Sequence, residues 1–228
     1  MGLFGFGKKD KPTNEATVST TAEPATPYVA PERNEVFLDL SKPGLLNLNK
    51  NEFLNLSKTG VNLEDIRVAA GWDVNHFGQD YDLDLCAYLL DSDNNLIDTV
   101  YYGHKRAHGF QLDKDNLTGE GDGDDENIFI NFDEIKPRVT HVIFGVVIYS
   151  ANSRKQSFKH VHNAFVRMVD QSVRPERELC RCGLSEDGGD NTAVQFAEIY
   201  RTDEGWNFAP IGTYSKDSIE SLGRHISR

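Results

Sequence analysis

The sequence predicts an all-β fold: a two-sheet β-sandwich with one or two short helices, preceded by a disordered N-terminal linker. Short runs with an apolar residue at every second position follow one another along the chain, as in strands that bury one face. Segments with the three- and four-residue spacing of a helix are few. Hydrophobic residues make up 38% of the 228 residues, so the chain can bury a core of ordinary size.

The strands are predicted in order from Val36. Three pieces with a step of eight residues each place two leucines on one face, and we interpret them as neighbouring strands of one sheet. The apolar run 142–149 is unbroken and predicts a central strand. The leucine pieces are 38–42, 46–50 and 54–58, and the other predicted strands are 66–72, 83–89, 96–102, 128–132, 142–149, 179–184, 194–201 and 206–214.

Two segments predict helices. Apolar residues from Phe158 to Val169 recur at three- and four-residue steps, which is the period of a helix that buries one side. A second short helix is predicted between Lys216 and Ile226.

Residues 1–35 are predicted to be a disordered N-terminal segment and linker, and residues 36–228 to be the folded domain. Four of the eight prolines lie between residues 8 and 35, in a stretch that cannot bury enough apolar area to offset its ordering entropy. Residues 2–7 hold three bulky apolar side chains but no secretory signal pattern. A frayed terminus and a small foot on a membrane remain the two interpretations of residues 2–7.

The net charge is −12, from 24 basic and 36 acidic residues. Nucleic-acid binding relies on lysine and arginine at phosphates, so we expect no nucleic-acid partner. Such a surface favours a cation or a basic partner, with plain solubility as the alternative. Three cysteines are too few for a disulfide framework and favour a reducing, cytoplasmic location, peripheral to the inner membrane surface if residues 2–7 contact lipid.

Acidic residues are concentrated between Asp113 and Glu126, where seven carboxylates face a single lysine. Glycines 119, 121 and 123 alternate with the acids, and glycine lets a backbone turn tightly and direct carbonyls inward. Oxygen ligands on such a turn suit a hard divalent cation, and calcium accepts six to eight of them. A solvated acidic loop is the alternative interpretation.

A second acidic patch lies at Asp82 and Asp84, which are two residues apart on a predicted strand and therefore share a face. At roughly 7 Å two ionised carboxylates repel by roughly 2 kcal/mol at an effective dielectric constant near 20, and a bound dication would reverse the sign. Asp73 is placed to join them from an adjacent strand end. The EF-hand pattern does not fit, because Leu96 takes its glycine position in the stretch that begins at Asp91.

Taken together, these stretches resemble the TerD family of tellurium-resistance and stress proteins, over about residues 36–225. The resemblance implies a β-sandwich that binds calcium, two ions in most members, through an Asp-Leu-Asp strand and a glycine-acid loop. The matching motifs are LNLNKNEFLNLSK (46–58), IRVAAGWD (66–73), YDLDLCAYLL (81–90), DNLTGEGDGDDE (115–126), VIFGVVIYSA (142–151) and HNAFVRMVD (162–170). The metal ligands that the motif alignment and the strand geometry suggest are Asp73, Asp82, Asp84, Asp115, Asn116, Asp124, Asp125 and Glu126, with carbonyls of Gly119 and Gly121.

The resemblance implies a calcium-stabilised scaffold or sensor in stress response or tellurite resistance, working with other proteins of a stress-response complex. We expect no enzymatic activity, because no nucleophile with a recognisable base and no poised titratable group at the ion is evident. The alternative hypothesis is a calcium-dependent module that binds a membrane or an anionic ligand.

Overall fold

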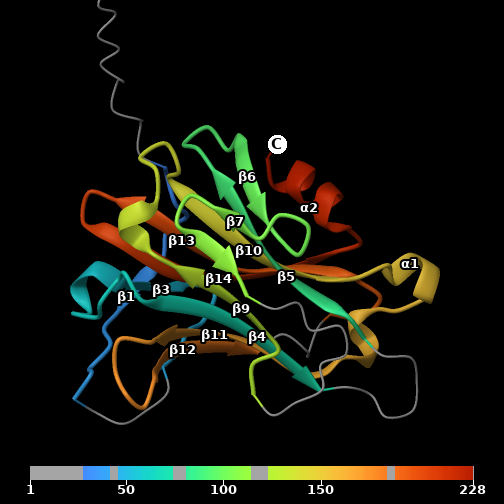
Figure 1. Ribbon diagram of the computed structural model, residues 1–228, viewed down its shortest axis with the longest axis horizontal. Coiled ribbons are helices and arrows are strands. Elements are labelled where there is room, and N and C mark those ends of the chain that lie inside the picture. The colour runs from blue at the N-terminus through green and yellow to red at the C-terminus, as the bar shows by residue number, and fades with distance from the viewer. Residues whose placement is uncertain (1–27, 42–45, 74–80, 114–122, 184–187, 228) are drawn as a thin grey trace, which may run out of the picture.

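A computed structural model describes residues 28–41, 46–73, 81–113, 123–183 and 188–227. Within these ranges the chain forms two sheets that pack face to face, which confirms the predicted β-sandwich (Figure 1). In the described residues the first sheet has seven strands, in the spatial order β1 (Asn34–Val36), β3 (Glu52–Asn55), β14 (Gly205–Ser215), β13 (Ala193–Thr202), β10 (His141–Ile148), β5 (Leu83–Leu90) and β6 (Leu96–Val100).

The strands that precede and follow the predicted acidic loop both belong to the second sheet. Over the same described ranges it also has seven strands, in the order β2 (Leu46–Asn47), β12 (Arg177–Gly183), β11 (His162–Asp170), β4 (Ile66–Asp73), β9 (Glu126–Ile130), β8 (Phe110–Leu112) and β7 (Arg106–Ala107). Four short helical segments lie between strands, and α2 (Ile219–Ile226) follows the last one; the four are η1 (Leu56–Lys58), η2 (Phe132–Glu134), α1 (Ala151–Arg154) and η3 (Phe158–His160).

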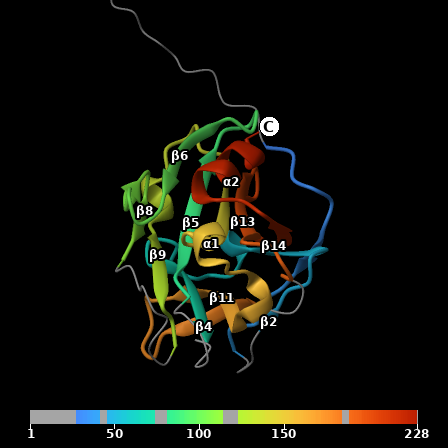
Figure 2. The ribbon, with the colours of Figure 1, turned by 90° about the vertical axis from the view of Figure 1, so that its right-hand side faces the viewer.

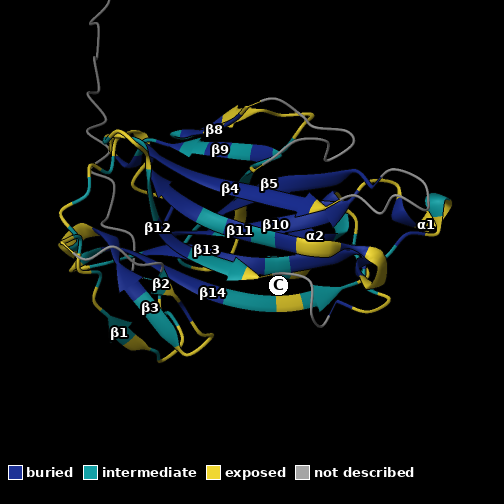
Figure 3. Cartoon of the chain, turned by 90° about the horizontal axis from the view of Figure 1, so that it is seen from below, coloured by how far each residue is buried: buried dark blue, intermediate teal, exposed yellow. Residues whose placement is uncertain are grey.

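The core lies between the two sheets, where alternate residues of each strand meet. In β5, Leu83, Leu85, Ala87 and Leu89 all belong to this core, as their spacing predicts. Figure 3 shows β4, β5 and β10 as almost continuously buried, whereas β1, β9 and β14 contain intermediate residues and most exposed residues lie in loops. The predicted interior position of 142–149 is confirmed, because β10 pairs with β13 on one side and β5 on the other.

Helix α2 covers the outer face of the first sheet, so β5 is buried on both sides (Figure 2). The Tyr88 hydroxyl donates a hydrogen bond to the backbone oxygen of Ile219 at 3.0 Å. A side chain at Gly145 would meet Leu222 at 3.1 Å, so the glycine permits the close approach of the helix. The short helix predicted at 216–226 is therefore confirmed and has a packing role.

The helix predicted between Phe158 and Val169 is wrong. Phe158 lies in η3, and the rest of the segment is β11, which pairs with β4 and β12. Ala164, Val166 and Met168 alternate into the core, but register shifts beside His162 and Met168 interrupt the alternation. Because of the turn and the register shifts, the apolar residues of this segment are spaced as in a helix, with a period near 3.6. The segment nevertheless forms a strand, because it pairs with a neighbouring strand on each side.

The leucine pieces do not form neighbouring strands of one sheet, contrary to the prediction. Residues 38–40 are not a strand, Leu46–Asn47 joins the second sheet, and Glu52–Asn55 joins the first. The chain thus crosses between the sheets within the repeat. Each piece buries leucine, but an alternating pattern does not determine which sheet receives it.

Residues 28–35, which are predicted to belong to the linker, contact the first sheet. The side chain of Arg33 donates to Glu198 at 2.6 Å, and both groups are nearly buried. The ring of Tyr28 stacks on His141 with centroids 3.9 Å apart. Residues 1–27, including the predicted membrane foot at 2–7, lie outside the described residues. Among the described helices, none is both long enough and apolar enough to cross a membrane.

Candidate metal centre

Strand ends from both sheets meet where the sequence predicts a metal site. Asp82 and Asp84 lie at the beginning of β5 in the first sheet, and Glu126 begins β9 in the second. Strand β4 ends beside Glu126, because Ala70 is its register partner. The two sheets therefore bring acids that are about 40 residues apart in sequence to one end of the sandwich.

Asp82 directly precedes β5, and Asp84 lies in that strand. Their exposed fractions are only 4% and 3%. The backbone oxygen of Asp82 accepts a hydrogen bond from the Tyr149 amide at 2.8 Å, which extends the pairing of β5 with β10. The guanidinium of Arg154, in α1, approaches the Asp82 carboxylate to 3.9 Å.

Glu126 joins the two sheets. Its side chain is 1% exposed, and its carboxylate accepts a hydrogen bond of 2.6 Å from the backbone amide of Leu85, next to Asp84. Burial raises the pKa of the Cys86 thiol well above its usual value, and the negative charges of Asp84 and Glu126 raise it further. Two carboxylates from different sheets thus act on the same buried residue.

The end of the acidic loop is fixed onto β4. The Asp125 carboxylate accepts a hydrogen bond from the Trp72 amide at 2.9 Å, and the Asp125 amide donates to the Ala70 oxygen at 2.9 Å. Gly123 has a positive φ of 111°, which other residues adopt only with strain. A Cβ atom at Gly71 would lie 2.5 Å from the Gly123 oxygen, so the close contact requires glycine.

Asp124 lies in a different environment, among arginines on the outer face of the second sheet. Arg167 binds its two carboxylate oxygens at 2.7 and 2.8 Å, and Arg67 also pairs with it. Burial raises the pKa of Asp124, but the hydrogen bonds from Arg167 and Arg67 outweigh burial and hold that pKa below its usual value. The structure therefore separates Asp124 from Asp84 and Glu126.

The remaining predicted ligands are outside this group or cannot be placed. Asp73 is exposed at the end of β4, and its carboxylate accepts a hydrogen bond from the Asn163 side chain. Asp115, Asn116, Gly119 and Gly121 lie outside the described residues. Among the residues that the structure does describe, no group of three or more His, Cys, Asp or Glu side chains could hold a metal ion.

The donors that are present suit a hard cation. Asp82, Asp84 and Glu126 offer carboxylate oxygens in a buried setting, and oxygen is the ligand that calcium takes. The neighbouring Cys86 is buried, and burial raises the pKa of its thiol well above its usual value, which disfavours the thiolate that a soft metal prefers. The described acids would form one part of a calcium cage, and residues 114–122 would have to supply the rest.

Sequence reasoning missed the arginines that bind Asp124. Arg67 and Arg167 are far apart in the sequence, so their spacing does not indicate that they meet. In addition, the segment that contains Arg167 is predicted to be a helix. The available signal was Arg67, an arginine inside the otherwise apolar strand Ile66–Asp73, because a buried arginine requires an acidic partner.

Comparison with known proteins agrees with the fold. The family model of the TerD domain matches residues 45–225. The chain is 38% identical over 173 residues to tellurium resistance protein TerD of Alcaligenes sp, covering 73% of this chain and 89% of that protein. It is 35% identical over 175 residues to general stress protein 16U of Bacillus subtilis (strain 168), covering 74% and 90%. A solved homologue of telluride resistance protein (TerD) from Streptomyces coelicolor A3(2) superposes with a TM-score of 0.62 at 23% identity, covering 74% of this chain and 99% of that one, and supports the fold alone.

Proposed function

Because this chain belongs to the TerD family, we propose that it is a non-enzymatic, calcium-binding β-sandwich that serves in stress response or tellurite resistance. One observation carries the calcium part of the proposal: Asp82, Asp84 and Glu126 are buried at the end of the sandwich that also receives the acidic loop. The names of the relatives support the stress and tellurite part.

The argument for a cation begins with the cost of gathering negative charge. Taking a carboxylate out of water is unfavourable unless it is paired, hydrogen-bonded or coordinated. Here the carboxylate of Glu126 from the second sheet reaches the backbone amide of Leu85, the residue after Asp84, and the charges of both acids act on Cys86. A dication between them would convert repulsion into attraction, and calcium tolerates the irregular oxygen sets that loops provide.

Residues 114–122 would complete the coordination. We propose ligands from Asp115 and Asn116 and from the carbonyls of Gly119 and Gly121, with two ions in all. Asp125 and Gly123 support this arrangement because their contacts with β4 fix one end of the loop beside Glu126. Calcium would then connect β5 of the first sheet to the loop of the second.

Such a connection suits a scaffold or sensor that changes stability with calcium. A ligand that binds only the folded state at 100 times its dissociation constant adds about 2.7 kcal/mol to the free energy of unfolding. We propose that the partners are other proteins of a stress-response complex in the cytoplasm, and that the chain catalyses no reaction itself.

The test is a calcium titration of the full chain by calorimetry after EDTA treatment, together with thermal melting. We expect saturable binding and a rise in melting temperature of about 5–11 °C at high calcium. The double variant Asp82→Asn and Asp84→Asn keeps the side-chain shape and removes the charge, so both effects should disappear. Asp203→Asn, an exposed acid elsewhere, should behave as the wild type.

A chain that shows no calcium heat and melts identically in EDTA and in calcium would overturn the proposal. Equal calcium binding by the double variant and the wild type would place the ion elsewhere. Sedimentation with anionic vesicles tests the alternative hypothesis of a calcium-dependent membrane module. Only such a module pellets with the vesicles when calcium is present and stays in the supernatant when it is absent.

A further inference from the structure

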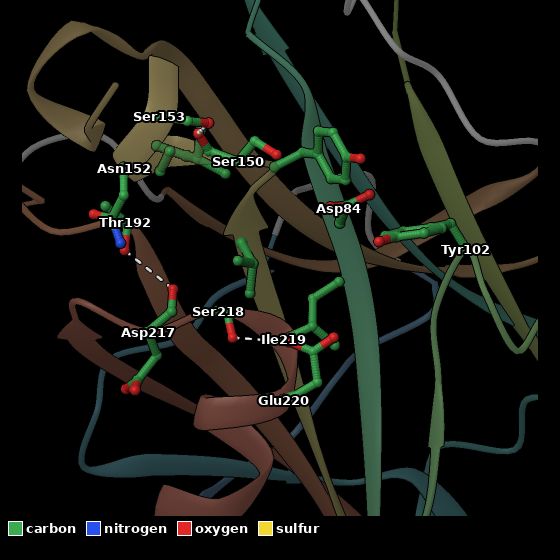
Figure 4. A pocket seen from close by; sticks show the side chains of 14 residues that line it. Asp84, Tyr102, Ser150, Asn152, Ser153, Thr192, Asp217, Ser218, Ile219 and Glu220 are labelled. Carbon is green, nitrogen blue, oxygen red and sulfur yellow. Dashed lines mark hydrogen bonds between the residues drawn. The ribbon is translucent and has the colours of Figure 1, made fainter. Parts of the chain in front are cut away.

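A hollow of about 340 Å³ lies on the outer face of the first sheet, on the side of α2 rather than of the second sheet (Figure 4). Its floor is buried and comes from β5 and β10, and its rim comes from the start of α1 and the start of α2. This volume falls in the range of pockets that take small molecules. The residues that matter chemically are Asp84, Tyr102, Tyr149, Asp217, Glu220 and the apolar Val147.

The hollow is negatively charged. Asp84 lies at the floor, Glu220 lines the hollow from the first turn of α2, and Asp217 lies just before that helix, while the described lining contains no lysine, arginine or histidine. The Asp217 carboxylate accepts a hydrogen bond from the Ser221 hydroxyl at 2.7 Å, and the Glu220 carboxylate accepts one from the Ser218 hydroxyl at 2.9 Å. The other oxygen of Asp217 lies 3.2 Å from the His225 ring nitrogen, so Glu220 is the carboxylate of the rim with more capacity left for a ligand, since a carboxylate has about four acceptor sites.

Aromatic rings form one wall. Tyr102 and Tyr149 pack edge to face with centroids 5.8 Å apart, and each is more than a third exposed. The wall already holds a cation from the chain itself: the Arg154 guanidinium lies 5.2 Å from the Tyr149 ring centroid and 3.9 Å from the Asp82 carboxylate. A tyrosine face next to a carboxylate is the arrangement that attracts organic cations.

We propose that this hollow binds a small organic cation, a protonated primary amine on a short alkyl chain. The ammonium would lie between Asp84, Glu220 and Tyr102, where the two carboxylates favour its charge and the aromatic ring lies next to it. The alkyl chain would lie on Val147 and Ile219, which belong to the apolar cluster on this outer face of the sheet. An inorganic dication prefers a denser set of oxygens and gains nothing from an apolar floor.

The overall charge of −12 favours the same class of ligand and opposes anions. The proposal goes beyond calcium binding and does not require it. Asp84 is common to both sites, so the experiment must separate an amine that binds here from an ion that binds at the end of the sandwich.

The test uses the full chain at fixed ionic strength with three probes: 1,5-diaminopentane, N-acetyl-lysine amide and the neutral 1-pentanol. We expect saturable binding of the diamine by calorimetry and none of the alcohol. Binding of the lysine amide as tightly as the diamine would identify a lysine side chain of a protein as the source, and preference for the diamine would identify a free amine.

Two variants locate the site without touching Asp84. Glu220→Gln removes one charge from the rim, and Tyr102→Leu removes a ring that is 36% exposed. Each should weaken diamine binding about five- to tenfold, whereas Asp203→Asn should leave it unchanged. Calcium binding should be the same in Glu220→Gln and the wild type, so loss of one activity does not imply loss of the other.

No saturable diamine binding, or equal weakening by Asp203→Asn and Glu220→Gln, would overturn the proposal, because the second result means attraction to net charge alone. Diamine binding by an EDTA-treated chain that does not bind calcium would support this site and reject the proposed calcium function. Calcium binding without diamine binding would do the reverse.

Discussion

Asp124 and Glu126 are two residues apart and both nearly buried, yet the fold gives them opposite surroundings. Asp124 lies on the outer face of the second sheet, where Arg67 and Arg167 neutralise it. Glu126 turns between the sheets, accepts the Leu85 amide and lies near Asp84. An acid that is already paired with arginines of the same chain stabilises the fold, whereas acids that come together from two sheets are suited to bind a cation from solution.

The largest expected effect is on the arginine side of this comparison. Asp124→Ala removes the carboxylate that Arg67 and Arg167 share and leaves Arg67, which is 8% exposed, with Glu176 as a remaining acidic partner. The loss should lower the free energy of unfolding by about 3 kcal/mol in EDTA. Urea denaturation measures it, with Asp203→Asn as the control. If the isosteric Asp124→Asn instead abolishes calcium binding and leaves stability in EDTA unchanged, Asp124 is a ligand and the comparison fails.

The contact between β4 and the loop should give the next largest effect. Gly71→Ala introduces a Cβ atom 2.5 Å from the Gly123 oxygen, which forces the loop away from β4 and should cost about 2 kcal/mol. Calcium affinity should also fall, because the same loop end carries Asp125 beside Trp72. The matched control is Gly183→Ala, where nothing lies within 4 Å of the added atom. Equal calcium affinities for the two alanine variants would show that the loop contact does not organise the site.

The free energy of unfolding should depend on pH in a way that reveals the ion pair of Asp124. The folded state holds the pKa of Asp124 below its usual value, so the stabilisation is complete above the unfolded pKa of about 3.9 and is lost as the pH falls through the lower folded value. The difference in unfolding free energy between the wild type and Asp124→Asn should therefore be constant from pH 7 to about 5 and shrink below about 4. A difference that grows on acidification would contradict the pairing.

The smallest effect is expected at the acidic end, from Arg154. Its guanidinium is 3.9 Å from Asp82 and about a third exposed, so Arg154→Gln should change stability by less than about 0.5 kcal/mol. Removing a positive charge near the proposed site should tighten calcium binding by about two- to threefold at low salt. The same calorimetric titration measures it, and weaker binding would mean that Arg154 supports the site rather than opposing the ion.

The alternation of apolar and polar side chains predicted strands correctly where the pairing of the strands is regular. Residues 66–73 and 83–90 have apolar side chains at every second position, and the structure forms β4 and β5 there. The same reasoning failed at 158–169, because register shifts broke the alternation into a helix-like pattern. It also failed for the leucine pieces, whose pattern is the same in either sheet.

The candidate site divides in the same way. The pairing of Asp82 with Asp84 on one strand face and the glycine-acid composition of the loop follow from local spacing. The hydrogen bond between Glu126 and Leu85 and the two arginines on Asp124 join residues that are more than 40 positions apart. Spacing along a chain carries no information about such contacts.

The sequence by itself determined the sandwich class, the β5 strand that carries Asp84, and the glycine at position 123, because side-chain alternation and backbone conformation depend on neighbouring residues. Only the tertiary structure decided which acids meet, which sheet receives each leucine piece, and where an aromatic, acidic hollow opens beside α2. These depend on strand order and register, which are fixed when distant segments compete to bury apolar surface and to satisfy their hydrogen bonds.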